Sequence, residues 1–273
     1  MSSIKDVCAV VVTYNPDNDI FENLQALSEQ VGFIAIVDNN SENIDSLKLY
    51  CKNKENLLLI ENKENLGIAK ALNIGATYAM ENNFMYLLTM DDDSKLLSNC
   101  VETMLDILEN NTDNIVSCGP NYDNEDIGNY KICDVLISSG NLTKLSVYRD
   151  VGGFDDKLFI DCVDFDFSFK IRLLGYSVAK IGSAKMKHKL GNLISIKTIF
   201  GRKEVIEHSA FRYYYIYRNG KYLRKKYRKN FKFFCFKSWI NSNLHILAIL
   251  LYHNDKKAKF KAIRQGKKDS KLL

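Results

Sequence analysis

The first 120 residues alternate between short, continuous apolar runs and segments whose apolar residues recur at helical spacing. Continuous runs of this length, bounded by polar residues, are typical of buried strands, and the spaced residues indicate amphipathic helices. Strands that alternate with helices predict a parallel sheet wound by right-handed crossovers, so we expect an α/β fold. The predicted strands are residues 7–12, 33–37, 57–60, 84–90 and 115–118, and the predicted helices are residues 20–30, 44–52, 65–80 and 96–109.

Polar stretches directly follow three of these strands. They are residues 13–15 (Thr-Tyr-Asn), 38–41 (Asp-Asn-Asn-Ser) and 91–94 (Asp-Asp-Asp-Ser). Ligands of parallel sheets bind beyond the carboxyl ends of the strands, where we expect these stretches to converge. No GxGxxG follows the first strand, no GxxxxGK[ST] occurs, and Gly67 and Gly75 are expected inside a helix. The pattern therefore favours a nucleotide site built from side chains, with a metal ion for the phosphates, over a dehydrogenase or a P-loop kinase.

Asp91 and Asp93 are candidate ligands for one divalent cation. They are two residues apart, so on extended backbone both side chains point the same way, and carboxylates suit hard cations. The alternative is a solvated acidic turn in which Ser94 or Asp93 caps the next helix.

Beyond Gly119 the pattern changes to shorter, mixed segments. Asp161 and Asp164 lie at helical spacing near the start of a helix that should end at Gly175, followed by a strand over residues 176–181. Acids in a first helical turn are commonly just partners of the helix dipole. His188 lies among three lysines, where a surface residue is the alternative to a ligand.

The last third is basic, aromatic and predicted to be helical. From residue 195 onward there are 21 Lys and Arg against 4 Asp and Glu, whereas the residues before it hold 17 basic and 29 acidic ones. Residues 233–252 are apolar and aromatic with lysines at both ends, which fits either a helix in a membrane interface or one packed on the main domain with a solvated basic face. No run reaches eighteen uninterrupted apolar residues, so we expect no spanning helix.

Cysteine use and the N-terminus predict the compartment. Seven cysteines are scattered without a CxxC pair, which is typical of reduced thiols in a cytosolic protein. The first apolar run stops at Thr13, too early for the apolar region of a signal peptide. We expect a cytoplasmic protein, peripheral on the inner face of the plasma membrane if the tail binds lipid.

Five motifs occur in one order along the chain. They are Thr13-Tyr14-Asn15, Val37-Asp38-Asn39-Asn40-Ser41, Asn65-Leu66-Gly67 with Asn73-Ile74-Gly75, Asp91-Asp92-Asp93-Ser94, and Phe159-Ile160-Asp161-(x)2-Asp164. In this order they resemble the inverting glycosyltransferases of family 2, and most closely the bacterial rhamnosyltransferase branch, over about residues 7 to 225. The resemblance implies the GT-A fold: a Rossmann-like, mostly parallel sheet flanked by helices, here with a helical, basic C-terminal extension.

The resemblance also implies roles for individual residues. Asp164 corresponds to the catalytic base that takes the proton from the acceptor hydroxyl. Asp93 corresponds to the metal ligand of the family's D-x-D element, supported by Asp91 and His188, and the ion would be Mg²⁺ or Mn²⁺. Asp38 corresponds to the acid that reads the base. The implied contacts to the nucleotide sugar are Thr13, Tyr14, Asn15, Asp38, Asn40, Asn65, Lys70, Asp91, Asp92 and Arg218.

Two positions depart from the family pattern. Val163 precedes Asp164 where the family frequently has Glu, although the rhamnosyltransferase branch tolerates this form. Asp92 is an acid where that branch often has an amide, which puts the metal affinity in doubt.

The expected function is metal-dependent, inverting transfer of a sugar from a dTDP- or UDP-sugar, with dTDP-L-rhamnose as the leading candidate. The expected acceptor is a saccharide or lipid-linked molecule in surface polysaccharide synthesis, and no nucleic acid is expected as a partner. The alternatives are a sugar nucleotidyltransferase and a catalytically inactive scaffold of a glycan-assembly complex. We expect a GT-A catalytic domain at residues 1–195, with a nucleotide-binding half (1–118) and an acceptor-binding half (119–195), followed by the extension at 196–273.

Overall fold

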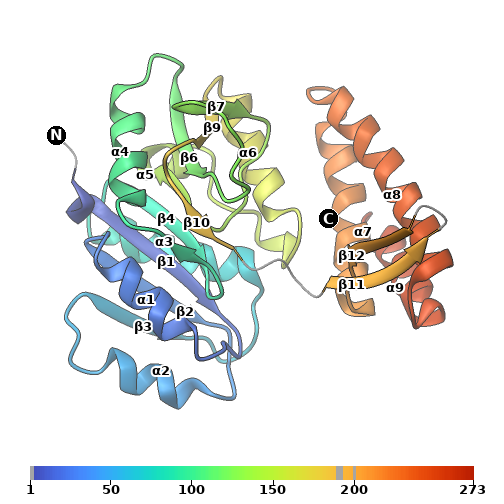
Figure 1. Cartoon of the computed structure of the whole chain (residues 1–273), viewed down its shortest axis with the longest axis horizontal. Coiled ribbons are helices and arrows are strands. Elements are labelled where there is room, and N and C mark those ends of the chain that lie inside the picture. Colours follow the sequence, from blue (N-terminus) through green and yellow to red (C-terminus); the bar gives the residue numbers. More distant parts are fainter. Residues whose placement is uncertain (1–2, 189–192, 199–200) are drawn as a thin grey trace. The chain divides into compact units, whose positions relative to one another are not determined.

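A computed structural model describes residues 3–188, 193–198 and 201–273. Its main feature is an eight-stranded sheet in the order β3-β2-β1-β4-β8-β6-β9-β7 (Figure 1). The strands β3, β2, β1 and β4 are parallel, and β8 runs antiparallel between β4 and β6. The bounds are β1 Val7–Thr13, β2 Phe33–Asp38, β3 Leu57–Glu61, β4 Tyr86–Asp91, β6 Ile115–Pro120, β7 Tyr130–Cys133, β8 Asn141–Lys144 and β9 Ser177–Ile181.

Helices flank this sheet. A second, two-stranded sheet follows the end of β4, at the polar edge, which is the edge formed by the carboxyl ends of the parallel strands. The small sheet pairs β5 (Lys95–Leu96) with β10 (Met186–Lys187). The helices are α1 Ile20–Ser28, α2 Ile44–Cys51, α3 Ile68–Glu81, α4 Cys100–Asn110, α5 Leu145–Asp150 and α6 Val163–Leu173, with 3-10 turns at η1 Ile4–Asp6 and η2 Asp156–Leu158.

Burial explains the central strands. All seven residues of β1 are buried, as the continuous apolar run predicts for a strand covered on both faces. Gly75 of α3 allows the close packing of this helix on β1, because a Cβ at this position would lie 2.3 Å from Cγ1 of Val10. The sheet and its helices therefore form a fixed platform for the loops at the strand ends.

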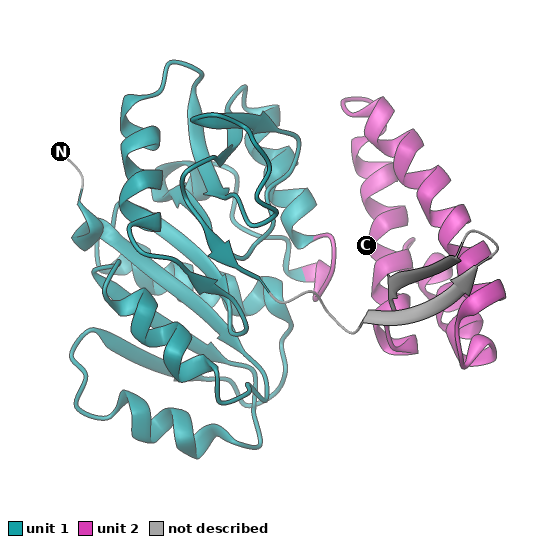
Figure 2. Cartoon of the chain, in the orientation of Figure 1, with its two compact units in different colours: residues 1–156, 163–189 teal, residues 157–162, 190–273 magenta. Residues whose placement is uncertain are grey.

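The chain divides into two compact units (Figure 2). Unit 1 comprises residues 1–156 and 163–189, and unit 2 comprises residues 157–162 and 190–273. Unit 2 holds a hairpin and three helices around a small core of Tyr213, Tyr217, Ile249 and Ile263. Its elements are β11 Leu193–Thr198, β12 Gly201–Ile206, α7 Ala210–Tyr227, α8 Lys232–Tyr252 and α9 Lys256–Asp269. The expected single domain at 1–195 stays a prediction, to which the structure adds that residues 157–162 group with the C-terminal part.

Several local expectations are corrected. Helix α4 begins at Cys100 after Asn99, so Ser94 and Asp93 do not cap it, and Lys95–Leu96 is a short strand. Gly67 precedes α3 instead of lying within it, with a φ of 82° that suits glycine. The predicted helical tail begins with the β11–β12 hairpin. Among the described residues, α8 is long and apolar enough to cross a membrane by length and composition alone, which the sequence criterion of eighteen uninterrupted apolar residues had excluded.

Candidate active site

The ends of β1 and β2 form a hydrogen-bonded cluster around Asp38. Thr13 and Asp38 are register partners, and Thr13 Oγ1 donates to Asp38 Oδ1 at 2.7 Å. The backbone amide of Ser41 donates to the other carboxylate oxygen at 2.8 Å, and its hydroxyl donates to Oδ1 at 2.5 Å. Asp38 is only 1% exposed. The structure therefore places Asp38 where the sequence predicted it, at a strand end, with both oxygens accepting hydrogen bonds that fix the loop shape.

The loop after β1 is tied to the loop after β2. The Asn15 amide donates to Ser41 Oγ at 2.7 Å, and Asn15 Oδ1 accepts from the Glu42 amide at 2.8 Å. Asn15 and Asn40 both adopt positive φ, a conformation that asparagine tolerates better than most residues. Tyr14 and Asn40 are exposed, and their roles in nucleotide binding stay predictions.

Asn39 is a structural residue that the sequence analysis did not single out. Its side chain is buried; Oδ1 accepts from Asn62 Nδ2 at 3.0 Å, and Nδ2 donates to the Gly67 carbonyl at 3.3 Å. These contacts hold the segment before α3 against the end of β2. Within that segment Asn65 Oδ1 accepts from the Gly67 amide at 2.9 Å.

Lys70, predicted to contact the nucleotide sugar, forms an ion pair in this structure. Its Nζ lies 2.8 Å from Asp156 Oδ2, and Asn73 Nδ2 donates to the other oxygen of Asp156 at 2.5 Å. Asn73 also donates to the Phe154 carbonyl at 2.9 Å. These bonds fasten the segment 154–156 to α3, and Lys70 reaches a phosphate only if it exchanges Asp156 for it.

Asp91, Asp93 and His188 come together at the polar edge of the sheet. One ligand atom from each lies within 4.8 Å of the other two. Asp91 ends β4 and pairs in register with Val12 of β1. The β5–β10 pairing brings His188 to this position, where its Nδ1 is hydrogen-bonded to Ser94 Oγ at 2.9 Å. The three predicted metal ligands, which are up to 97 residues apart in the sequence, therefore form one cluster, named the metal-ligand cluster after that prediction.

Asp92 lies between these two acids with a different environment. Burial, together with the neighbouring charge of Asp93, raises the pKa of the Asp92 carboxyl to about 6, although backbone hydrogen bonds from Tyr14 and from Asp92 itself oppose the rise. The backbone carbonyl of Asp92 accepts from Asn23 Nδ2 at 2.9 Å. Asp92 therefore differs from the exposed Asp93, because its carboxyl group is half-buried and its charged form is disfavoured.

Tyr122 packs against the histidine of the metal-ligand cluster. Its ring meets the His188 ring edge-on, with centroids 5.9 Å apart. Burial raises the pKa of the Tyr122 hydroxyl, and the charges of Asp123 and Asp164 raise it further while Lys180 opposes them. The hydroxyl is therefore a neutral donor within the electrostatic reach of Asp164. Tyr122 was not among the predicted site residues, because it lies in the irregular stretch after β6, where no periodic pattern marks it.

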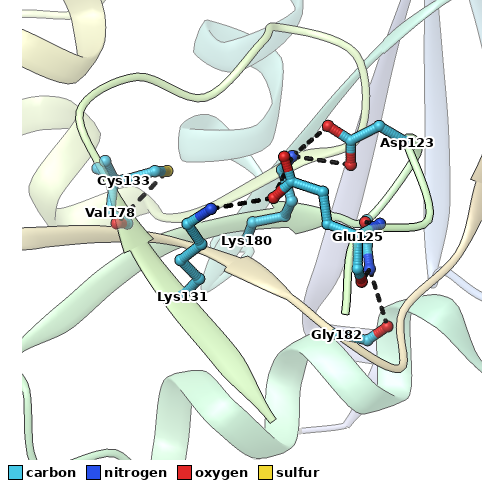
Figure 3. Close-up of polar contacts among 8 residues, drawn as sticks. Asp123, Glu125, Lys131, Cys133, Val178, Lys180 and Gly182 are labelled. Carbon is cyan, nitrogen blue, oxygen red and sulfur yellow. Dashed lines mark hydrogen bonds and ion pairs between the residues drawn. The ribbon is translucent and has the colours of Figure 1, made fainter. Parts of the chain in front are cut away.

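A network of charged residues fixes the loop that carries Tyr122 (Figure 3). Lys180 of β9 reaches across to Asp123 at 2.6 Å and lies 4.9 Å above the Tyr122 ring. Glu125 pairs with Lys131 of β7 at 3.1 Å. Although burial favours the neutral acid, the hydrogen bonds and charge of Lys180 lower the pKa of Asp123. The loop is thus attached to two strands of the main sheet.

Asp164 lies in the first turn of α6, as predicted. Its Oδ1 accepts from the Phe165 amide at 2.9 Å. The exposed amides of a helix start favour an ionised carboxylate, which a base requires. The next acid, Asp166, is fully buried and pairs with Lys170 at 3.2 Å, so it anchors the helix and is not available to solvent.

The segment 157–162, which directly precedes α6, is held by α7 within unit 2. Phe159, Asp161 and Cys162 all have φ between 62° and 66°, which is unfavourable for residues other than glycine. Asn219, fully buried on α7, donates to the carbonyls of Leu158, Ile160 and Asp161 at 2.7 to 2.9 Å. The pair Arg218-Asn219 resembles the rhamnosyltransferase branch, but the sequence did not predict these contacts of Asn219, because its partners lie about 60 residues earlier in the chain.

Arginines of α7 reinforce this contact. Arg212 pairs with Asp161, with Nη2 3.1 Å from Oδ1. Arg218, predicted to contact the nucleotide sugar, donates from Nη2 to the Lys157 carbonyl at 2.6 Å. Its guanidinium carbon lies 4.7 Å from the Tyr215 ring centroid. The predicted role of Arg218 in nucleotide binding stays a prediction; what the structure shows is its contact with this segment.

The fold and the family model identify the class. Residues 8–172 match the family described as glycosyl transferase family 2, and this match covers more than half of the chain. The chain belongs to this family. Its similarity to one relative is more specific: it is 32% identical over 248 residues to the dTDP-rhamnosyl transferase RfbF of Shigella flexneri, covering 81% of this chain and 80% of the relative. The protein is therefore a rhamnosyltransferase-like glycosyltransferase.

Solved glycosyltransferases share the fold. The structure of S. aureus TarS in complex with UDP-GlcNAc matches with a TM-score of 0.55 at 14% identity, over 97% of this chain and 91% of that one. The structure of GalNAc-T7 with UDP, GalNAc and Mn²⁺ matches with a TM-score of 0.58 at 14% identity, over 67% of this chain but only 43% of that one. At these identities the likeness shows the fold alone, and it confirms the predicted GT-A architecture.

The residues of the metal-ligand cluster suit a divalent cation. Two carboxylates and one imidazole are acceptable ligands for Mn²⁺, and carboxylates suit Mg²⁺. Ligand atoms on opposite sides of an ion at about 2.1 Å lie about 4.2 Å apart. The spacing of at most 4.8 Å is close to this value, so small side-chain shifts bring Asp91, Asp93 and His188 to a common ion.

Proposed function

We propose that the protein is a metal-dependent, inverting glycosyltransferase that moves L-rhamnose from dTDP-L-rhamnose to a saccharide or lipid-linked acceptor. It works in the cytoplasm, in the synthesis of a surface polysaccharide. The sugar is proposed from the identity to a dTDP-rhamnosyl transferase, which extends over most of both chains. The observation that carries the proposal is the convergence of Asp91, Asp93 and His188 at the strand ends, beside the loops that should bind the nucleoside.

The nucleoside side of the site is proposed at the ends of β1 and β2. The buried Asp38 holds the loop 38–41 in one conformation through Thr13 and Ser41, so the binding surface is formed before the ligand arrives. Tyr14, which is 54% exposed, offers a ring face for a pyrimidine base. A preformed surface of this kind lowers the entropy cost of binding.

The diphosphate side is proposed at the metal-ligand cluster. A bound Mn²⁺ or Mg²⁺ would neutralise the charge that develops on the leaving diphosphate. Asp91, Asp93 and His188 would hold the ion, and the hydrogen bond of Ser94 to His188 Nδ1 leaves Nε2 of the ring for it. The ring of Tyr122 packs edge-on against this histidine, with the ring centroids 5.9 Å apart.

Asp164 is the proposed base. It takes the proton from the acceptor hydroxyl as that oxygen attacks the anomeric carbon from the face opposite the leaving group, which inverts the configuration. The amide of Phe165 orients the carboxylate of Asp164. Helix starts in general favour negative charge, which suits a base at this position.

The substitution Asp164→Asn tests this assignment. It keeps the shape of the side chain and removes its basicity, so transfer should fall by about 10³-fold, a typical value for a general base. Binding of dTDP should change less than threefold, because the nucleotide contacts lie elsewhere. Asp150→Asn, an exposed acid at the end of α5, is the matched control. Substantial transfer by the Asp164 variant would remove this residue from the mechanism.

A panel of nucleotide sugars tests the donor. In the presence of Mn²⁺, the midpoint temperature of thermal unfolding should rise most with dTDP-rhamnose, because a ligand that binds only the folded state stabilises that state. A larger shift with a UDP-sugar would replace rhamnose in the proposal while leaving the transferase assignment intact.

A further inference from the structure

Among the residues that the structure describes in unit 2, none covers one apolar face of helix α8. Its large apolar side chains on this face are between 50% and 77% exposed, although the helix belongs to a folded unit. Positions 236, 240, 244, 247 and 251 recur every three or four residues, so they form a continuous stripe along the helix. The exposed residues are Phe233, Phe236, Trp239, Leu244, Leu247, Leu250 and Leu251. An exposed stripe of this size marks an interaction surface.

The opposite face of α8 is fastened to α7. Arg224 of α7 donates from Nη1 to Ser238 Oγ at 3.3 Å and to Ser242 Oγ at 3.2 Å. Tyr217 donates to the Ser242 carbonyl at 3.1 Å, and Ile249 is fully buried in the core of the unit. A helix held along its side in this way can lie along a surface, but it cannot cross a bilayer without breaking these contacts.

Exposed cations lie at both ends of the stripe. Lys225, Lys229 and Lys232 lie before or at the start of α8, and Lys256 and Lys257 lie just after its end. Between residues 210 and 269 there are 17 Lys and Arg and only two acids. A second copy of this unit would bring the same positive charge to the stripe and be repelled, whereas an anionic surface would be attracted.

We propose that the exposed face of α8 lies in the headgroup region of a membrane that contains anionic phospholipid, with the helix axis parallel to the membrane plane. The aromatic and leucine side chains enter the boundary between headgroups and acyl chains, and the flanking lysines contact lipid phosphates. Nucleic acid would satisfy the lysines but not the apolar stripe. Membrane binding by this unit is independent of which sugar the enzyme transfers.

The single tryptophan of the chain reports on this surface directly. Trp239 is exposed on the stripe, so its emission should shift to shorter wavelength when the full-length protein meets vesicles of phosphatidylcholine with about one third phosphatidylglycerol. Vesicles of phosphatidylcholine alone should give a much smaller shift. Lipids brominated near the headgroup should quench Trp239 more than lipids brominated near the chain end, because the helix lies in the interface.

Two sets of variants separate the apolar and charged contributions. Phe236→Ser with Leu247→Ser should weaken sedimentation with the anionic vesicles by at least about tenfold, while Leu49→Ser with Ile132→Ser, which are exposed in unit 1, should not. The triple variant Lys225→Glu, Lys229→Glu and Lys232→Glu should weaken binding to the anionic vesicles by about a hundredfold.

Other results would overturn the proposal. An unshifted Trp239 spectrum with anionic vesicles would exclude lipid insertion. A shift that depends on protein concentration without lipid would assign the stripe to a second copy of the chain. If the protein bound DNA as tightly as it binds the anionic vesicles, with no change in Trp239 emission and with complete loss of DNA binding in high salt, the surface would be assigned to nucleic acid.

Discussion

Removing the side chain of Asn219 should release the segment that leads into α6. This buried amide satisfies three carbonyl groups of residues 158–161. Each hydrogen bond is worth about 0.5–1.5 kcal/mol net, and a buried carbonyl without a partner costs about 1–3 kcal/mol. Three left-handed residues in the segment cost roughly 1–2 kcal/mol each and persist only while their surroundings hold them. We expect Asn219→Ala to lower the free energy of unfolding by about 2–4 kcal/mol.

The effect on catalysis follows from chain connectivity. Residue 162 is adjacent to the first residue of α6, and Asp164 is the second residue of that helix. A displacement of about 1 Å at a catalytic group can cost about 10²-fold in rate. The kcat of Asn219→Ala should fall by roughly this factor, whereas Kd for dTDP should stay within threefold, because the nucleotide loops lie in unit 1.

The assay combines urea unfolding, followed by far-UV circular dichroism, with transfer kinetics and dTDP binding. Asn219→Asp should be worse than the alanine variant, because a carboxylate would face three carbonyl oxygens. Asn243→Ala, an exposed asparagine on α8, is the control and should change stability by less than about 0.5 kcal/mol. If the free energy of unfolding of Asn219→Ala lies within about 1 kcal/mol of the wild-type value and its kcat is unchanged, the proposed role of Asn219 is refuted.

Three further predictions concern other contacts. Gly75→Ala should destabilise the fold by about 1–3 kcal/mol in urea unfolding, because its Cβ would lie 2.3 Å from a methyl group of Val10; unchanged stability would disprove this tight packing. Burial, helped by nearby cations, lowers the pKa of His208 from 6.5 to about 4, so the unfolded chain binds the proton first and stability should fall as the pH drops from 7 to 5. His208 should account for about 2 kcal/mol of the fall in the free energy of unfolding between pH 7 and pH 5. In thermal unfolding at the two pH values, the His208→Gln variant should lose correspondingly less stability than the wild type. Lys180→Met should lower the free energy of unfolding by about 1–2 kcal/mol and weaken Mn²⁺ binding. In a double-mutant cycle with Asp123→Asn, the two losses of unfolding free energy should be less than additive.

The sheet and the ends of its strands were predictable because their signals are local. The buried runs of β1, β2 and β4 are continuous in the sequence, and the acids that follow them mark the ligand-binding edge. The same periodicity locates Asp38, Asp91 and Asp164 on elements that the structure contains. Parallel pairing then brings the ends of neighbouring strands together with no further information.

The rest of the site depends on contacts between distant segments. His188 reaches Ser94 through a pairing of two residues per strand, too short to leave a periodic pattern. The position of Tyr122 depends on the loop that Lys180 holds. The hydrogen bonds that hold residues 158–161 come from Asn219, one asparagine in a helix dominated by aromatic and basic residues. The predicted helix began at residue 96, but Leu96 belongs to β5 and α4 begins only at Cys100; a strand of two residues is too short to show a period of its own.

Binding of Mn²⁺ in the presence of dTDP tests the central claim most directly. Electron paramagnetic resonance would measure free Mn²⁺ in titrations of the wild type, Asp93→Asn, His188→Ala and the control Asp150→Asn. If Asp91, Asp93 and His188 share one ion, the first two variants should bind Mn²⁺ at least about tenfold more weakly, while the control binds like the wild type. Wild-type affinity in both Asp93→Asn and His188→Ala would contradict a shared metal site and, with it, the proposed handling of the leaving diphosphate.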